Sequence, residues 1–127
     1  MIRIDLESPQ PIEQQIAAAL RQALARGEVD PGEELPSVRQ LAADLGVHWN
    51  TVARAYRRLA DEGLLLVRRG RSVLVRGGEP RTRTRATHAE LRRLFAETIA
   101  AGVLSGLTHE GLSRIFEEAL AGFSGRE

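Results

Sequence analysis

The sequence predicts a mainly α-helical chain with a small β wing, and three features of its 127 residues support this fold class. Three segments between residues 12 and 62 carry apolar side chains at helical spacing. Two β-prone runs, residues 64–67 and 73–75, flank a charged glycine turn and predict a hairpin. Two more helical segments follow residue 86. This order is typical of a winged helix-turn-helix domain followed by a two-helix C-terminal hairpin.

The first elements precede the helix-turn-helix. Alternating apolar and charged residues predict a short half-buried strand over residues 2–6. Pro11 is suited to the first position of a helix that ends at Gly27, and residues 30–32 form a turn. The apolar positions of this helix are Ile12, Ile16, Ala19, Leu20, Ala23 and Leu24.

The next two helices are joined by a turn of only a few residues. Ser37 begins the first of them, and Gln40 three residues later completes a capping-box pattern. Gly46 ends it, and the following helix runs from about His48 to Glu62. Their apolar positions are Val38, Leu41, Ala42 and Leu45 in the first and Val52, Ala55, Tyr56 and Leu59 in the second.

The C-terminal part begins after a stretch without apolar periodicity. We therefore expect a winged helix-turn-helix domain over 1–76, a linker over 77–86 and a helical region over 87–127. Thr87 and Glu90 predict a second capping box, and Thr108 caps the last helix. The apolar stripes comprise Leu91, Leu94, Phe95, Thr98, Ile99 and Val103, then Leu112, Ile115, Phe116, Ala119, Leu120 and Phe123.

Two amphipathic helices of this length do not bury both stripes by themselves, so they need a partner surface. A second copy of the chain is the favoured partner, which predicts a homodimer. Packing of these helices onto the first domain is the alternative.

Charge is distributed unevenly behind a net value of +1. Residues 39–85 carry eleven Arg and four acidic residues, whereas the segments on either side are net acidic. A basic centre between acidic flanks suggests a surface for a polyanion such as nucleic acid. A solvated Arg-rich face is the alternative.

Several function classes are excluded by residue types and their spacing. The chain has no Cys, and its three His residues lack metal-ligand spacing, so we expect no metal site and no cofactor. Its serines show no nucleophile motif, which argues against an enzyme. The N-terminus resembles no secretory signal and no run is long enough to span a membrane, so we expect a cytoplasmic protein.

An ordered set of motifs resembles the N-terminal domain of GntR-type bacterial transcription regulators. They are PGEELPSVRQLA at 31–42, LGV at 45–47, NTV at 50–52, AY at 55–56, Leu59 and EGL at 62–64. The short tail looks like that of the YtrA-like subfamily. The resemblance implies a DNA-binding repressor that acts as a dimer on a palindromic operator in double-stranded DNA; it names no effector.

The resemblance places DNA contacts on the second and third helices. Arg39 lies opposite the apolar stripe of its helix, where a guanidinium can take a phosphate or reach a guanine edge. By its motif position it matches the arginine that contacts DNA in the family. The start of the third helix, His48 to Thr51, is expected in the major groove. Asn50 suits an adenine edge and Thr51 a phosphate or thymine methyl, unless either simply caps the helix.

The chain departs from the family at His48-Trp49, where Ser-Arg is usual. Trp49 packs against a sugar or a thymine methyl, or covers part of the domain surface. Arg54 is the preferred phosphate ligand, whereas Arg57 and Arg58 lie toward the far end of the helix. Four residues of the wing turn, Arg68, Arg69, Gly70 and Arg71, are expected at a minor groove.

The sequence thus favours a sequence-specific homodimeric repressor. The alternatives are a winged-helix protein-interaction module and a nonspecific DNA-binding protein. Residues expected at the dimer interface are Leu91, Leu94, Phe95, Ile99, Leu112, Ile115, Phe116 and Leu120.

Overall fold

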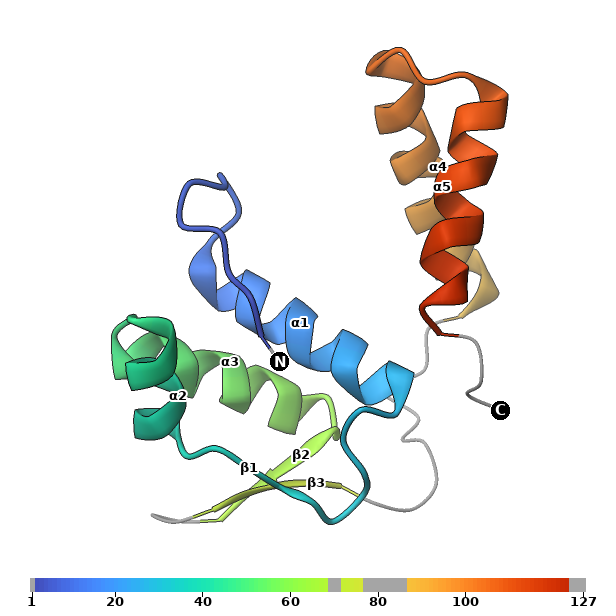
Figure 1. Ribbon diagram of the computed structural model, residues 1–127. Coiled ribbons are helices and arrows are strands. Elements are labelled where there is room, and N and C mark those ends of the chain that lie inside the picture. Colours follow the sequence, from blue (N-terminus) through green and yellow to red (C-terminus); the bar gives the residue numbers. More distant parts are fainter. Residues whose placement is uncertain (1, 69–71, 77–86, 124–127) are drawn as a thin grey trace. The chain divides into compact units, whose positions relative to one another are not determined.

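The computed structural model describes residues 2–68, 72–76 and 87–123, which fall into two compact units, 1–84 and 85–127. The elements of the first unit are α1 (Ile12–Arg26), β1 (Glu34–Leu35), α2 (Val38–Leu45), α3 (Trp49–Asp61), β2 (Leu65–Val67) and β3 (Val73–Val75) (Figure 1). The second unit consists of α4 (His88–Leu104) and α5 (His109–Ala121). The predicted fold class, mainly helical with a small β wing, is confirmed.

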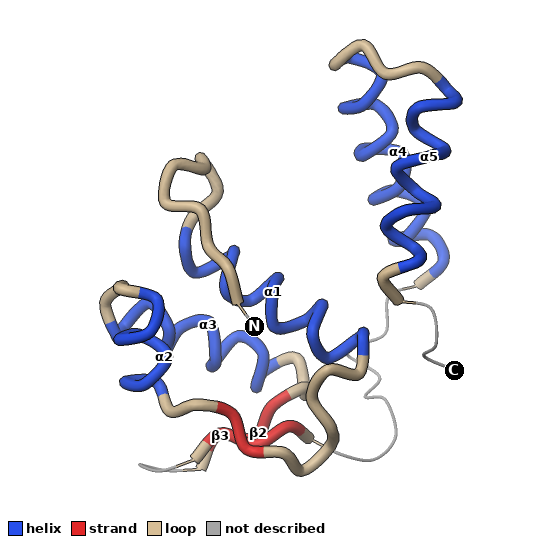
Figure 2. Tube along the Cα trace, viewed as in Figure 1, coloured by secondary structure: helices blue, strands red, loops and turns tan. Residues whose placement is uncertain are grey.

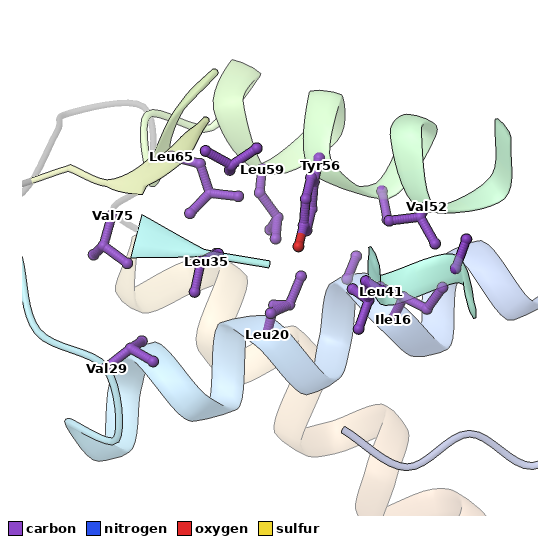
Figure 3. Packing of buried hydrophobic residues seen from close by; sticks show 14 residues of the cluster. Ile16, Leu20, Val29, Leu35, Leu41, Val52, Tyr56, Leu59, Leu65 and Val75 are labelled. Atoms are coloured by element: carbon purple, nitrogen blue, oxygen red, sulfur yellow. The ribbon is translucent and has the colours of Figure 1, made fainter. Parts of the chain in front are cut away.

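The core of the first unit forms beneath α3. Val52, Tyr56 and Leu59 are at most 1% exposed, and Figure 3 shows them facing Ile16 and Leu20 of α1. Their spacing of three and four residues places them on one face of the helix. The opposite face of α3 is therefore left for solvent or for a ligand.

The wing is a three-stranded antiparallel sheet with the order β1-β3-β2 (Figure 2). β2 and β3 form the predicted hairpin, with Leu66 opposite Leu74. β1, which the sequence pattern does not predict, pairs with the other edge of β3 through Leu35 and Val73. A strand of only two residues shows no alternation by which to recognise it.

The predicted strand over residues 2–6 is wrong, because this segment is irregular. The side chain of Gln15 in α1 satisfies the backbone of Asp5 in place of a neighbouring strand. Asp5 N–H donates to Gln15 Oε1 at 2.7 Å, and Gln15 Nε2 donates to the Asp5 carbonyl at 3.0 Å. Ile2 and Ile4 still pack against the core, while Leu6 is 70% exposed.

The predicted helix boundaries hold to within about two residues. Pro11 is the N-cap of α1 rather than its first residue. The capping boxes Ser37–Gln40 and Thr87–Glu90 are both present, and Thr108 caps α5.

Candidate nucleic-acid interface

The start of α3 is shaped by its N-cap, which is His48. Its Nδ1 accepts a hydrogen bond from the backbone N–H of Asn50 at 3.0 Å. The alternative that Asn50 or Thr51 caps the helix is therefore wrong, and the Asn50 side chain remains exposed. A ring nitrogen that accepts this bond carries no proton, which assigns the proton of the neutral imidazole to Nε2. His48 thus keeps one N–H donor for a further partner.

Arg39, Trp49 and His48 form a cluster at this end of α3, which we call the tip cluster. The Arg39 guanidinium carbon lies 5.7 Å from the centre of the Trp49 ring, within the range of a cation–π contact. The rings of Trp49 and His48 are stacked, with centroids 5.4 Å apart and planes inclined by 29°. All three side chains are exposed. Side chains from α2 and α3 therefore meet on one open surface.

Two contacts position Arg39, one within the start of α2 and one between α3 and the segment that leads into α2. The Ser37–Gln40 capping box sets the first turn of α2, in which Arg39 is the second residue. Tyr56 Oη, in the middle of α3, donates a hydrogen bond to the Pro36 carbonyl at 2.7 Å. Burial raises the pKa of the Tyr56 hydroxyl to about 12. Figure 1 shows the resulting arrangement, with α2 beside the first turns of α3.

The arginines farther along α3 differ in their partners. Arg54 Nε lies 3.4 Å and Arg58 Nη2 lies 2.6 Å from the carboxylate of Glu13 on α1. Arg57 forms no ion pair with any residue that the structure describes, and its spacing of seven from Asn50 puts both on the same helix face. Arg57 is thus more available to bind a phosphate than the sequence indicated, and Arg54 is less available.

A further ion pair joins the other end of α3 to α1. Arg21 donates to both carboxylate oxygens of Glu62, at 2.8 and 2.5 Å. The hydrogen bond from Arg21 is the main reason why the pKa of Glu62 is lowered. An open cavity of about 370 Å³ beside these contacts is lined by Glu13, Arg54, Arg57, Arg58, Asp61 and Glu62. A lining made only of charged side chains does not fit a small apolar ligand.

The wing turn contributes one residue that can be described. Arg68 directly follows β2, is exposed, and its backbone N–H donates to the Ser72 carbonyl at 2.8 Å. The predicted contacts Arg69, Gly70 and Arg71, and the predicted linker 77–86, lie outside the described residues.

The α4–α5 unit exposes the apolar residues expected at a dimer interface. Leu94, Phe95, Ile99, Ile115, Phe116 and Leu120 are each 46–53% exposed, and Leu91 is 39% exposed. Phe95 and Phe116 contact each other edge to face, with centroids 6.0 Å apart. Leu112 is half-buried and packs close to Gly102, where an added Cβ would lie 2.4 Å from Leu112 Cδ2.

The sequence did not point to two residues that make important contacts in these units. They are Glu13, which pairs with Arg54 and Arg58, and Gly102, which lies against Leu112. Glu13 reaches its partners only when α1 crosses α3, and no spacing along the chain predicts such a crossing. Gly102 interrupts a helical segment, which is a weak signal of close helix packing.

No helix in ranges 2–68, 72–76 and 87–123 is both long and apolar enough to cross a membrane. Within the same ranges, no group of three His or acidic residues is placed to hold a metal ion.

Known proteins resemble this chain both in sequence and in fold. The sequence profile of the bacterial regulatory proteins of the gntR family matches residues 12–75. The transcriptional repressor YtrA of Bacillus subtilis strain 168 is 32% identical over 126 residues, which cover 96% of this chain and 97% of that protein.

Two solved structures extend the comparison. YtrA from Sulfolobus acidocaldarius, a GntR-family transcription factor, is 39% identical and superposes with a TM-score of 0.62, covering 78% of this chain and 97% of that one. A structure described as a transcriptional antiterminator from Listeria monocytogenes EGD-e is 26% identical with a TM-score of 0.80, covering 98% of this chain and 94% of that one.

Proposed function

Since the chain belongs to the GntR family of bacterial transcription regulators, we propose that it is a homodimeric repressor that binds a palindromic operator in the cytoplasm. Its relatives are DNA-binding regulators rather than enzymes, and the repressor YtrA matches over nearly its whole length. The observation that carries the proposal is the tip cluster. A cation from α2 and the first residues of α3 meet on one exposed surface, which is what a helix entering the major groove requires.

In this proposal, the start of α3 reads base edges and Arg39 takes a guanine edge or a phosphate beside it. Asn50 is exposed on the face opposite the core, where its amide suits adenine. Thr51 is half-buried and suits a phosphate. The His48 Nε2–H is a further phosphate donor next to them.

Phosphate contacts from the rest of the basic surface then set the orientation of the domain on DNA. Arg57 is the first choice on α3, because no acidic residue pairs with it in the described part of the chain. Arg54 joins it where a phosphate displaces Glu13. The wing residues Arg68 to Arg71 are proposed at the adjacent minor groove.

We propose that residues 1–76 bind DNA, that 77–86 link the two parts, and that 87–127 form the dimer interface. The exposed stripe of α4 and α5 supports this assignment, because an apolar surface of this kind seldom stays in contact with water. Its dimer contacts are Leu91, Leu94, Phe95, Ile99, Leu112, Ile115, Phe116 and Leu120.

An electrophoretic shift on the promoter region of the protein's own gene tests the proposal. We expect Arg39→Ala to weaken specific binding by about tenfold or more, since one good bidentate contact is worth roughly 1–3 kcal/mol. The matched control is Arg114→Ala, which removes the same charge from an exposed position on α5. Equal losses in the two variants would show only a bulk charge effect. A wild-type protein that binds unrelated DNA as tightly would be a nonspecific binder, and one that binds none would favour the protein-interaction module.

A further inference from the structure

Trp49 is an exposed indole that the core does not need. It is the first residue of α3 and 46% exposed, while Val52, Ala55, Tyr56 and Leu59 close the core beneath the same helix. It contacts the Arg39 guanidinium and the His48 ring. The core cluster of the first unit is therefore closed without Trp49.

These contacts fix the indole before any partner arrives. The backbone of α3 holds His48 through the hydrogen bond between Asn50 N–H and His48 Nδ1, and His48 in turn stacks on Trp49. Arg39 approaches the same ring from α2. A side chain that is already ordered loses little conformational entropy on binding, so its remaining exposed surface is suited to recognition.

An apolar surface in the major groove meets one apolar group on the base edges, the 5-methyl group of thymine. This step rests on the proposed function, in which the start of α3 enters that groove. We propose that Trp49 is a specificity-determining residue that contacts the 5-methyl group of one thymine in each operator half-site and holds Arg39 beside it. The position read by Trp49 is then adjacent to the one contacted by Arg39.

The test uses duplexes that the wild-type protein selects from a random DNA library. In these, each thymine of a half-site is replaced in turn by deoxyuridine, which removes only the methyl group. At one position, we expect the affinity of the wild-type protein to fall by about fourfold per half-site, the factor expected for one buried methyl group. Trp49→Ala should bind the thymine duplex and the deoxyuridine duplex with equal affinity. Trp49→Phe should keep part of the difference in affinity between them. Leu6→Ala, which removes an exposed apolar side chain elsewhere, should behave as the wild type.

A second measurement tests the contact with Arg39. The factors by which Arg39→Ala and Trp49→Ala lower the affinity for DNA should not multiply in the double variant. The two side chains contact each other, so each substitution also removes part of the contribution of the other. Thermal unfolding confirms that the variants fold, which the exposure of both side chains leads us to expect.

The outcomes separate this inference from the proposed function. Specific binding without any uracil effect, or with an equal effect in Trp49→Ala, would overturn the role of Trp49 and point to a sugar contact instead. The dimeric repressor would stand in that case. A library that yields no preferred sequence would overturn the proposed function and the role of Trp49 together.

Discussion

At the scale of single residues, Glu13 sets how much positive charge α3 presents. One carboxylate lies within 3.4 Å of Arg54 and 2.6 Å of Arg58, so a phosphate must compete with it for both cations. Such competition weakens nonspecific binding, because unrelated DNA offers phosphate contacts but no base contacts in return.

Glu13→Gln should therefore raise the affinity for unrelated DNA and steepen its salt dependence. Each additional phosphate contact increases the slope of log K against log salt by about 0.9. Fluorescence anisotropy with a random duplex at several salt concentrations measures both quantities. Glu7→Gln removes an equal charge from an exposed position in the same unit. If both variants gained the same affinity, the ion pairs of Glu13 would have no special role.

Tyr56 gives the domain a defined sensitivity to alkali. Its pKa is raised to about 12 by burial, whereas an unfolded tyrosine titrates near about 10. Below the pKa of the unfolded state, the Tyr56 hydroxyl is protonated in both states and the free energy of unfolding has its full value. As the pH rises from about 10 to about 12, the hydroxyl ionises in the unfolded state first, so the free energy of unfolding falls. The chain has one Tyr, no Lys and no Cys, so few other side chains titrate in this range.

Urea unfolding at pH 8 and pH 11 tests this assignment with Tyr56→Phe. At pH 8 we expect the variant to be less stable by about 1 kcal/mol, because the Pro36 carbonyl loses its hydrogen bond. At pH 11 the difference in free energy of unfolding between the two proteins should narrow. The unfolded wild type is stabilised there by ionisation of its phenol, whereas the variant has no phenol to ionise. An equal gap at both pH values would show that another group causes the alkaline loss.

At the scale of elements, Gly102 allows α4 and α5 to approach each other. A Cβ at this position would lie 2.4 Å from Leu112 Cδ2, so a larger side chain would require either a change in the Leu112 side chain or a shift of α4 away from α5. The edge-to-face contact of Phe95 and Phe116 depends on the same approach.

Gly102→Val should therefore weaken dimerisation, at a cost of about 1–3 kcal/mol for overpacking. Sedimentation equilibrium measures the monomer–dimer constant. Gly111→Ala is the control, because a Cβ there meets its nearest atom at an ordinary 3.4 Å. If Gly102→Val dimerised as strongly as the wild type, the packing of α4 against α5 would have no effect on the dimer interface.

The helices were predictable from the sequence because their signals are local. Apolar spacing and capping residues such as Ser37 and Thr87 lie within a few positions of the boundaries that they set. The strand predicted over residues 2–6 failed because alternation alone cannot show whether a partner strand exists. The third strand of the sheet is instead β1, whose partner β3 is distant in the sequence.

The candidate site was predictable to a similar extent. Motif position identified Arg39 and the start of α3, but not that Trp49 contacts Arg39 across two helices. Nor did it indicate that His48 is the cap, which leaves Asn50 exposed. Such contacts arise from tertiary packing, which no single helical pattern specifies.

At the scale of the whole molecule, the basic surface and the apolar stripe have complementary uses. The net charge of +7 over residues 39–85 supplies affinity for any duplex. Specificity for a palindrome requires two copies of the α3 tip related by a two-fold axis, which the stripe on α4 and α5 can provide.

Hydroxyl-radical footprinting on a library-selected duplex tests this arrangement most directly. Two α3 helices in successive major grooves should protect two segments whose centres lie about 34 Å apart, one helical turn. Both segments should be lost together in Arg39→Ala, because each copy contributes the same residue. A single protected segment, or protection that continues without preference along unrelated DNA, would contradict the two-fold arrangement.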